Sequence, residues 1–583
     1  MTKNMISAAK QQVAALTQQA YEKAAGAGLL KPGAQISGSV DIPKDPTLGD
    51  YATSFALAGA KALGQNPRAL AQILVDNLDL EESYFDKVEI AGPGFLNFRL
   101  GSRWYGEVLA NIEEAGNQYG QVDEGHGKKV MVEFVSANPT GPMHMGNARG
   151  GVLGDTLANV MARAGYDVWK EFYVNDAGNQ IHKFATSIHA RYMQIILGEE
   201  GFAFPEEGYH GEDIKELARA FYAEHGDSFK DAGEDQWLEA MSRFGLAVNI
   251  PKMESDLKRY GIEYDLWYLE SDLHNSGYVA ETVELLKEKG WTYEKDGALW
   301  LNTTELLKEK FIREGKTREQ ADKLDLKDDV LRRGNGFYTY FAADIAYHRN
   351  KLEVRGFDQA INIWGADHHG HVARLQAALD GLGLNGSERL TVVLMQLVNL
   401  LQDGKPVRMS KRSGKAIALH DLLDEISVDA ARYFFNSRSS TTPLDFDLDL
   451  AVRQDSENPV YYVQYAHARI CTLVGRLAEA GHTVPAAAQV DATLYTSAEE
   501  LGLIKALAML PEEIRVAARD YDPSRINRYL LDVAGAFHRF YNADRILGEE
   551  EQVLAARLKL ADTTRSVIAN CLELLGVTAP EKM

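Results

Sequence analysis

The 583-residue sequence predicts a multidomain α/β protein built on a doubly wound parallel sheet. Residues 130–174 combine a buried strand, a turn rich in proline and glycine, an amphipathic helix and a second strand. That order is typical of a mononucleotide-binding half of a Rossmann-like sheet. After about residue 456 every strong apolar pattern has helical spacing, which predicts a separate all-helical domain.

Composition places the chain among ordinary globular proteins, with 45% hydrophobic and 25% charged residues. No apolar run is long enough to span a bilayer, and the first residues lack the core of a signal peptide. Cys471 and Cys571 are too few for a disulfide framework or a cysteine-rich zinc site, so the expected compartment is the cytosol. The net charge of −22 mildly disfavours a nucleic-acid partner, although RNA responds to a local basic stripe rather than to the sum.

Residues 1–120 are predicted to form a small α+β appendage. Apolar spacing indicates helices over 7–24 and 51–63, and Asn66 followed by Pro67 marks the start of a third helix. Residues 87–100 alternate like two strands around a Gly-Pro turn, which predicts a hairpin.

The turn after the strand at 130–135 is the first candidate site. Prolines and a glycine prevent the strand from continuing, and His144, Gly146 and Asn147 then precede a helix that ends at Gly165. A loop between the carboxyl end of a parallel strand and a helix N-terminus can hold phosphate oxygens on free N–H groups. Taken alone, a histidine before a glycine is more often a surface or capping residue.

Other glycine patterns give no nucleotide site. The chain contains no G-x-x-x-x-G-K-[ST] sequence. One G-x-G-x-x-G occurs, at Gly381, Gly383 and Gly386, but it follows a helical stretch and leads into a strand. Because a dinucleotide site needs the reverse order, we interpret this sequence as a turn that ends a helix.

The middle of the chain is predicted to contain an insertion followed by the second half of the sheet. Residues 182–330 are polar and mostly helical, with a hairpin near 291–301, and their charge runs are most simply solvated helix faces. In the segment that follows, Tyr340 and Asp344 share one face if the chain is helical there. Alone, such an aromatic residue usually belongs to the core.

A predicted strand over 360–364 leads into Asp367, His368, His369 and His371. Three histidines with an aspartate in this loop leave a metal site, and hence a metal-dependent hydrolase, as an alternative. No recognised metal-site spacing completes that pattern.

Two further regions complete the sequence. Residues 392–400 read as one more apolar strand, and after a turn residues 407–415 form a basic segment that by itself would be a surface loop. In the last domain, helices are predicted over 458–477, 522–547 and 551–575, with one or two more over 497–520. Tyr462 and Tyr541 on these helices are either core residues of a bundle or rings that stack on unpaired bases.

Two separated segments resemble the signatures of class I aminoacyl-tRNA synthetases. The string ANPTGPMHMGNARG is similar to the arginyl branch of that class, whose first signature is His-x-Gly-His, with Asn147 at the fourth position. The string RMSKR at 408–412 resembles the second signature, Lys-Met-Ser-Lys-Ser, with Arg408 and Arg412 at its first and last positions. Lys411 matches the catalytic lysine of the signature.

The resemblance implies ATP-dependent ligation of arginine to its tRNA through an arginyl-adenylate, and it suggests a role for each matching residue. The catalytic residues implied are His144, Arg408, Lys411 and Arg412. Those implied for ATP are His144, Gly146, Asn147, Asp367, His368, His371, Met409, Ser410 and Lys411. Those implied for arginine are Glu133, Ser136, Asn138, His144, Tyr340, Asp344 and His368. Those implied for tRNA are Asn97, Tyr462, Tyr541 and Met583.

Glu133 and Asn97 each have a plainer interpretation. Glu133 is an acid inside an apolar strand, and a buried carboxylate normally has a partner, which is either a neighbouring loop or the cation of a ligand. Asn97 is first a strand residue and only second an RNA contact.

The expected organisation has three domains, at 1–120, 121–445 and 446–583, with the insertion at about 182–330 and the second signature loop at 408–412. By the resemblance, the first domain contacts the tRNA elbow and the last binds the anticodon. The expected cofactor is ATP with Mg²⁺, without a tightly bound metal. The expected partners are arginine and its tRNA, with no membrane, and the chain is expected to be a cytoplasmic monomer. Another class I synthetase remains an alternative.

Overall fold

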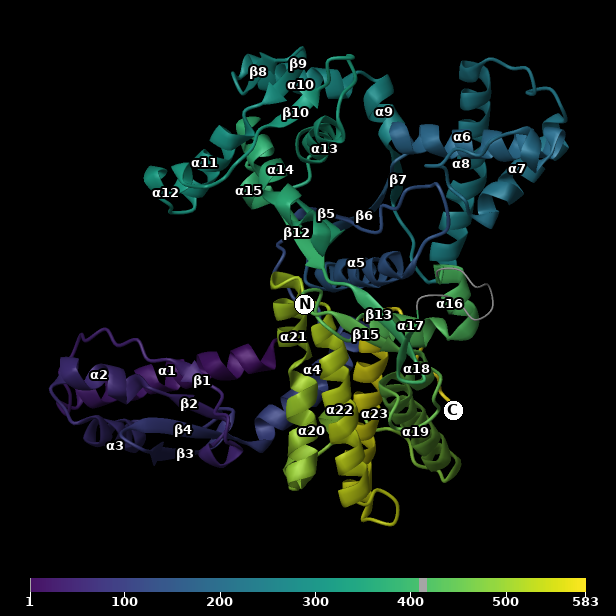
Figure 1. Cartoon of the computed structure of the whole chain (residues 1–583). Coiled ribbons are helices and arrows are strands. Elements are labelled where there is room, and N and C mark those ends of the chain that lie inside the picture. The colour runs from purple at the N-terminus through teal and green to yellow at the C-terminus, as the bar shows by residue number, and fades with distance from the viewer. Residues whose placement is uncertain (1, 408–416) are drawn as a thin grey trace.

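The structure is a computed structural model that describes residues 2–407 and 417–583. Figure 1 shows three bodies, with the N-terminal domain at lower left, a helical domain at the bottom and the sheet-containing domain above. No helix in the described ranges is long and apolar enough to cross a membrane.

The N-terminal domain packs helices against a four-stranded antiparallel sheet of order β1-β2-β4-β3. Its helices are α1 (Met5–Gly26), α2 (Phe55–Leu63) and α3 (Pro67–Asn77), and its strands are β1 (Val40–Asp41), β2 (Tyr51–Thr53), β3 (Phe85–Ala91) and β4 (Phe95–Leu100). The predicted first helix, the hairpin and the Asn66 cap are confirmed, since the Asn66 side chain accepts a hydrogen bond from the Arg68 amide at 3.0 Å. The helix predicted over 51–63 begins only at Phe55, because Tyr51 and Thr53 bury alternate side chains in β2.

The central sheet is parallel throughout and has the order β12-β11-β5-β6-β7. Its strands are β5 (Lys129–Glu133), β6 (Asp167–Val174), β7 (Leu266–Leu269), β11 (Gln359–Gly365) and β12 (Leu390–Met395). The chain leaves β5 toward β6 on one side and returns to β11 on the other, so β5 borders the point where strand order reverses. In open α/β sheets, ligands bind at the carboxyl ends of the strands at such a point.

Two groups of elements separate these strands along the chain. Between β6 and β7 lie α6 (Asn179–Leu197), α7 (Glu212–His225) and α8 (Glu234–Arg259), which enclose a small core of their own. Between β7 and β11 lie α9 (Glu270–Asn275), α10 (Tyr278–Glu288), β8 (Thr292–Lys295), β9 (Ala298–Leu301), α11 (Thr303–Arg313), α12 (Arg318–Asp322), β10 (Asp329–Arg332) and α13 (Tyr340–Arg349). The predicted hairpin is confirmed as β8 and β9. The region expected to be an insertion, 182–330, thus also supplies β7 to the central sheet.

The chain after β11 completes the domain. It forms α14 (His369–Gly381), α15 (Gly386–Arg389), β12, β13 (Val398–Gln402), β14 (Lys405–Val407), α16 (Leu419–Glu425), α17 (Val428–Phe435), β15 (Leu444–Asp447) and α18 (Leu448–Ala451). The single strand expected over 392–400 is two strands, because the chain leaves the sheet after Met395 and the Gln396 amide bonds instead to the Ser440 carbonyl at 2.9 Å. Gly383 has φ +83° between α14 and α15, which confirms the predicted helix-ending turn.

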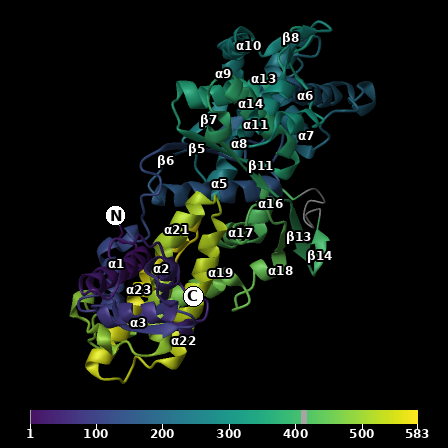
Figure 2. The same cartoon turned by 90° about the vertical axis from the view of Figure 1, so that its left-hand side faces the viewer.

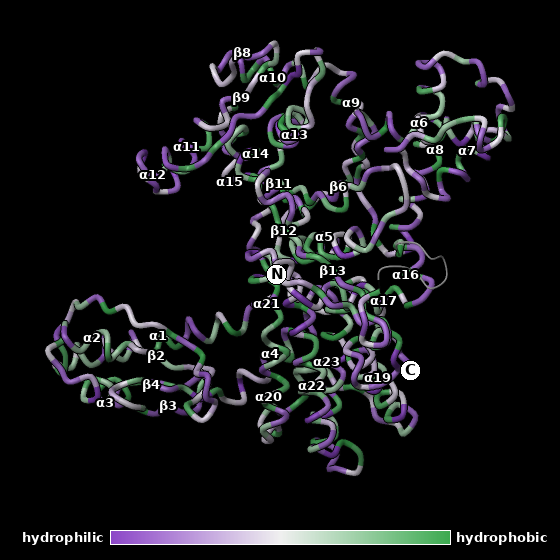
Figure 3. The backbone as a smooth tube through the Cα atoms, viewed as in Figure 1, coloured by the Kyte–Doolittle hydropathy of each residue, from purple (hydrophilic) through white to green (hydrophobic). Residues whose placement is uncertain are grey.

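The C-terminal domain is helical, and hydrophobic residues recur along its helices in Figure 3. It contains α19 (Pro459–Glu479), α20 (Ala498–Ala508), α21 (Leu510–Arg519), α22 (Ser524–Ala543) and α23 (Glu551–Leu575). The helix predicted to reach Leu547 ends at Ala543, since Asp544 adopts an extended backbone and its carboxylate accepts a hydrogen bond from Ser497 at 2.8 Å.

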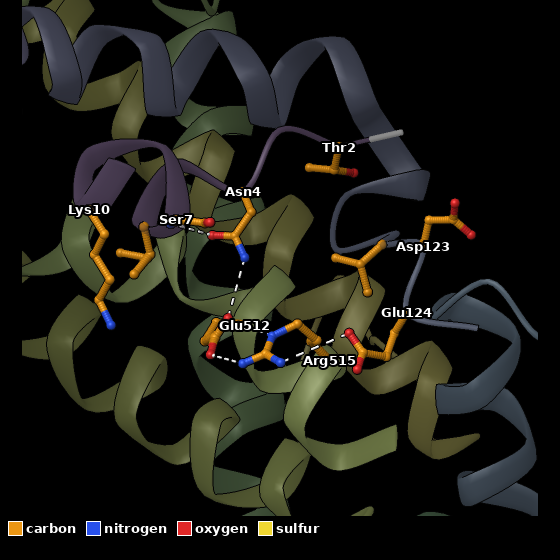
Figure 4. A pocket seen from close by; sticks show the side chains of 10 residues that line it. Thr2, Asn4, Ser7, Lys10, Asp123, Glu124, Glu512 and Arg515 are labelled. Carbon is orange, nitrogen blue, oxygen red and sulfur yellow. Dashed lines mark hydrogen bonds and ion pairs between the residues drawn. The ribbon is translucent and has the colours of Figure 1, made fainter. Parts of the chain in front are cut away.

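Polar contacts join the N-terminal domain to the helical domain. A groove of about 420 Å³ lies between the start of α1, the segment at 122–124 and α21. On its wall, Arg515 donates to Glu512 at 2.6 Å and lies 3.9 Å from the carboxylate of Glu124, while Asn4 donates to Glu512 at 3.4 Å (Figure 4). Residues from three separate parts of the chain therefore meet at this junction.

The helix α5 (Met145–Arg163) lies between the sheet and the helical domain, as the second view shows (Figure 2). Arg432 on α17 is fully buried and holds α5 to the elements on either side of it. Its guanidinium donates to the Asp155 carboxylate on α5 at 2.5 Å and to the Leu575 carbonyl at the end of α23 at 2.7 Å. It also donates to the carbonyls of Tyr260 and Gly261, both at 3.2 Å. One side chain thereby ties both domains to α5.

Replacing Arg432 by methionine should lower the free energy of unfolding by about 3–5 kcal/mol, because the buried Asp155 carboxylate loses its cation. Urea unfolding followed by circular dichroism measures this loss. The matched control is R438M, six residues along the chain on an exposed side chain, which should stay within about 0.5 kcal/mol of the parent. An equal effect of the two substitutions would contradict the role given to Arg432.

Candidate active site

The first signature loop leaves the sheet through a strained turn at the end of β5. Val135 and Ser136 both have positive φ, +69° and +41°, which is rare for residues other than glycine and especially for a β-branched one. The Ser136 hydroxyl donates to Glu133 at 2.9 Å and accepts from the Tyr173 amide at 3.2 Å. These bonds hold the turn to β5 and β6, so the following residues emerge at the carboxyl edge of the sheet.

His144 is the N-cap of α5. Its Nδ1 accepts a hydrogen bond from the Gly146 amide at 3.2 Å, and the Asn147 side-chain oxygen accepts from the His144 amide at 3.0 Å. Desolvation lowers the pKa of His144, and an accepting Nδ1 leaves Nε2 to carry the proton of the neutral ring. The positive end of a long helix thus sits beside an uncharged donor, an arrangement that suits phosphate oxygens.

The described chain that follows the second signature segment lies beside the first signature loop. Arg408, Met409, Ser410, Lys411 and Arg412 lie outside the described residues. On the carboxyl side of this segment, Ala418 forms a β-bridge with His144, and the Leu419 amide donates to the Met143 carbonyl at 2.9 Å. On its amino side, β14 ends at Val407. The chain that follows the second signature therefore returns to the first loop.

Tyr340 and Asp344 lie one turn apart on α13, as predicted. Asp344 is one-third exposed, and its carboxylate lies 2.9 Å from Nε2 of His371. Tyr340 lines a groove of about 880 Å³ with Asp176, Gly178 and Arg333. A Cβ built on Gly178 would stand 3.1 Å from the Tyr340 hydroxyl, so the absence of a side chain there keeps the ring in place. Tyr340 thus lines the groove together with the acids Asp176 and Glu270, and Asp344 stands one helical turn away from Tyr340.

Glu133 has a partner inside the protein. Its Oε2 lies 2.5 Å from Nζ of Lys351, and the Lys351 side chain has no exposure to solvent. Sequence reasoning missed Lys351, because its partner Glu133 lies more than 200 residues earlier in the chain. The local sequence of the π-helical turn Asn350–Val354 also gives no sign that a lysine there is buried. Of the two interpretations of Glu133, the internal partner is the one present here.

The loop after β11 is divided between two environments. Asp367 and His368 are exposed and lie 3.7 Å apart, whereas His371 is held against Asp344. Within residues 2–407 and 417–583, no group of three or more histidine, cysteine or acidic side chains is arranged to hold a metal ion. The geometry therefore gives the metal-dependent hydrolase alternative no support from the described side chains.

The candidate RNA contacts differ in exposure. Asn97 is only 6% exposed, paired between β2 and β3, which favours its structural interpretation. Tyr462 on α19 packs against His538 of α22, with ring centroids 4.8 Å apart, and the Arg469 guanidinium lies 4.0 Å from the Tyr541 ring centroid. Met583 is 51% exposed. Asn138, from the arginine set, is also exposed.

Comparisons with known proteins agree with this geometry. Family models match three successive regions: the arginyl tRNA synthetase N terminal domain at 8–100, the class I (R) tRNA synthetase catalytic domain at 108–442, and the DALR anticodon binding domain at 463–583. The chain is 49% identical to an arginine--tRNA ligase of Ruminiclostridium cellulolyticum over 582 residues, with 100% of both chains covered. A similar relative from Caldanaerobacter subterraneus is 49% identical over 580 residues, again with full coverage of both.

Solved structures give the same answer. A putative arginyl-tRNA synthetase from Campylobacter jejuni is 34% identical with a TM-score of 0.72, and the match covers 83% of this chain and 100% of the other. The synthetase from Thermus thermophilus, at 23% identity and a TM-score of 0.69, covers 98% of this chain and 99% of the other and supports the fold.

The parallel sheet with its His144 loop, together with the catalytic-domain match, defines a class I aminoacyl-tRNA synthetase. Full-length identity then selects the branch within that class. The chain belongs to the arginyl-tRNA synthetase family.

In the ligand-free protein, titration of His144 should give a pKa below the ordinary 6.5, so that the ring is neutral at pH 7. Addition of ATP should raise that pKa, because triphosphate charge beside the ring favours the protonated form. NMR of the imidazole signals, assigned with an H144Q variant, measures both values. A pKa of 6.5 or higher without ATP, or no change with ATP, would contradict the phosphate-facing role.

Proposed function

We propose that the chain joins arginine to its tRNA in two steps at the carboxyl edge of the central sheet. In the first, the arginine carboxylate attacks the α-phosphorus of ATP, which forms arginyl-adenylate and releases pyrophosphate. In the second, the 2′-hydroxyl of the terminal tRNA nucleoside attacks the activated carbonyl carbon and AMP leaves. The observation that supports the proposal is the bridge between His144 and Ala418, because it brings the chain that follows the second signature segment back to the first signature loop.

The proposed ATP site combines the two signature loops. The α5 N-terminus and Nε2 of His144 bind the phosphates, with the Gly146 amide and the Asn147 amide group nearby. Since the Asn147 oxygen already accepts from the His144 backbone, its NH₂ is the group left to donate to ATP. Lys411, with Arg408 and Arg412, neutralises the departing pyrophosphate, and Met409 and Ser410 complete that loop. Asp367, His368 and His371 are the proposed residues on the adenosine side.

The proposed arginine site lies between β5 and α13. Asp344 accepts the guanidinium in its plane, and Tyr340 covers its face, a combination suited to a planar and always charged group. Ser136, Asn138 and His368 are proposed to hold the backbone end of the amino acid beside His144. Glu133 is buried under this proposed site, where it forms an ion pair with Lys351.

The proposed tRNA surface runs over the helical and N-terminal domains. Tyr462 and Tyr541 supply aromatic faces on neighbouring helices for unpaired bases, and the exposed Met583 extends that surface. For the N-terminal domain we propose a contact with the tRNA elbow, carried by the exposed residues around β4 more than by the buried Asn97.

We propose further that ATP enters as its Mg²⁺ complex and that the chain works as a monomer in the cytoplasm. Mg²⁺ usually binds through substrate phosphates and water, with few protein ligands. Both signature segments and the arginine pocket come from one chain, so a second copy is not needed to complete the site. Both cysteines are free, which fits a reducing compartment.

Arginine-dependent exchange of labelled pyrophosphate into ATP, measured with and without tRNA, tests the proposal. The parent protein should catalyse exchange with arginine and not with lysine. Lys411→Ala should lower the exchange rate by about 100-fold or more while arginine affinity changes little, because the lysine acts on the phosphates. K405A, on the exposed β14, is the control and should retain parental rates. Normal exchange by K411A would reject the role of Lys411, and no exchange by the parent would reject the function.

Asp344→Asn should raise the KM for arginine by about 10- to 100-fold and leave the KM for ATP within about threefold, because it removes one charged partner of the guanidinium. Steady-state exchange kinetics at varied arginine and ATP measure the two constants separately. D296N changes an exposed acid in the β8–β9 turn and should alter neither constant. Equal changes in both constants would show that Asp344 has no selective role toward arginine.

A further inference from the structure

Arg149, near the start of α5, is a buried cation without an acidic partner. Its side chain is fully buried. Burial lowers the pKa of Arg149 only to about 10, so the guanidinium is charged at neutral pH. No carboxylate of residues 2–407 and 417–583 forms an ion pair with it. The residues outside those ranges include no aspartate or glutamate, so they cannot supply its acid either.

The other buried lysines and arginines of the described chain each contact a carboxylate. Such pairing is expected, because taking a charge out of water costs free energy that an opposite charge offsets. The pairs are Lys310 with Glu314, Arg349 with Glu281 and Glu353, Lys351 with Glu133, Arg432 with Asp155, and Lys559 with Glu113. Arg149 departs from a pattern that these buried cations share.

Neutral carbonyl groups hold the Arg149 guanidinium in place. Nη1 donates to the Gln396 carbonyl at 2.8 Å, and Nη2 donates to the carbonyls of Ser439 and Thr442 at 3.0 and 2.9 Å. Nε is buried with no hydrogen-bond partner among the described residues. Carbonyl dipoles stabilise a cation but carry no net charge that could cancel it, so the positive charge acts on the surroundings.

These contacts place the charge at the carboxyl edge of the central sheet. Gln396, whose carbonyl accepts from the guanidinium, directly follows the last residue of β12. Arg149 itself comes three residues after Gly146, a rise of about 4.5 Å along α5, and helical side chains lean toward the amino end of their helix. The guanidinium therefore lies at the same edge as the α5 N-terminus.

We propose that Arg149 strengthens the binding of ATP from a distance, because its unpaired charge adds to the positive end of α5 and attracts the triphosphate. This inference rests on the proposed ATP site at the α5 N-terminus. Burial removes the water that would screen the charge. At an effective dielectric constant of about 20, two unit charges about 10 Å apart change an equilibrium constant about tenfold. In this interpretation Arg149 is a positioning residue that does not touch the substrate.

Calorimetric titration of ATP and of adenosine into R149K and R149Q separates charge from shape. Neither replacement reproduces the guanidinium fork, but lysine keeps the positive charge and glutamine removes it. R149Q should weaken ATP binding at least tenfold and adenosine binding less than threefold, because adenosine carries no phosphate. R149K should bind both ligands within about threefold of the parent.

Arg163, at the other end of α5, provides the matched control. It also donates to backbone carbonyls, those of Asn117 at 2.7 Å and Tyr119 at 3.3 Å. Because its Cα lies about 21 Å farther along the helix, R163Q should bind ATP within threefold of the parent. ATP binding and arginine-dependent exchange by the unmodified protein test the proposed function itself, so failure of that function and failure of this inference are distinguishable.

Three outcomes would overturn the inference. The first is a folded R149Q protein with parental ATP affinity. The second is equal weakening of ATP and adenosine in R149Q, which would indicate a distorted site. The third is an R149K protein that binds ATP as weakly as R149Q, which would assign the effect to the fork. If R149Q cannot be recovered folded, R149K decides alone: parental ATP affinity supports the inference, and a tenfold loss with the charge retained contradicts it.

Discussion

The constraint on which the rest of the structure depends is the strained turn at the end of β5. Val135 and Ser136 hold left-handed backbone conformations that cost free energy, and the Ser136 bonds to Glu133 and to the Tyr173 amide offset part of that cost. Because β5 lies where the strand order reverses, this turn sends the chain across the carboxyl edge and into the cap of α5. The helix end proposed to face the phosphates and the bridge to Ala418 both follow from that path.

The charged and titratable side chains of the site are paired or neutral in a similarly specific way. Glu133 is paired below the surface with Lys351, Asp344 is paired with His371, and desolvation lowers the pKa of His144 at the helix end. A formal net charge of −22 for the whole chain therefore says little about the site, where Glu133, Asp344 and His144 each have a defined neighbour. Local arrangement rather than total charge decides which ligands such an edge can bind.

The sequence predicted best where a periodic pattern covered a whole element. The strand over Asp167–Val174, the last helix Glu551–Leu575 and the capped helix after Asn66 all agree with the structure, since each has its own apolar period and end signals. The prediction failed at β2, where Tyr51 to Thr53 is too short to show alternation, and at the break after Met395, which depends on a bond to distant Ser440.

The candidate site divides in a similar way. His144, Tyr340 and Asp344 could be found because a motif or a helical spacing marks them, and the bridge to Ala418 shows that the chain after the second signature segment reaches the His144 loop. Lys351 could not be found, because its partners come from β5 and β11 and meet it only in the folded sheet. The individual roles of the site residues stay predictions, as does the extent of each domain.

The placement of α5 has a mechanical consequence. Its amino end carries the His144 cap, while farther along Asp155 is gripped by Arg432 and Asn159 donates to the Leu574 carbonyl of the helical domain at 3.2 Å. A helix of 19 residues is a stiff rod about 28 Å long, so a tilt of about 2° imposed at one end moves the other by about 1 Å. Reacting groups are sensitive to misplacement on that scale. A small movement of the helical domain would thus tilt α5 and displace the His144 cap at the edge of the sheet where the reaction is expected.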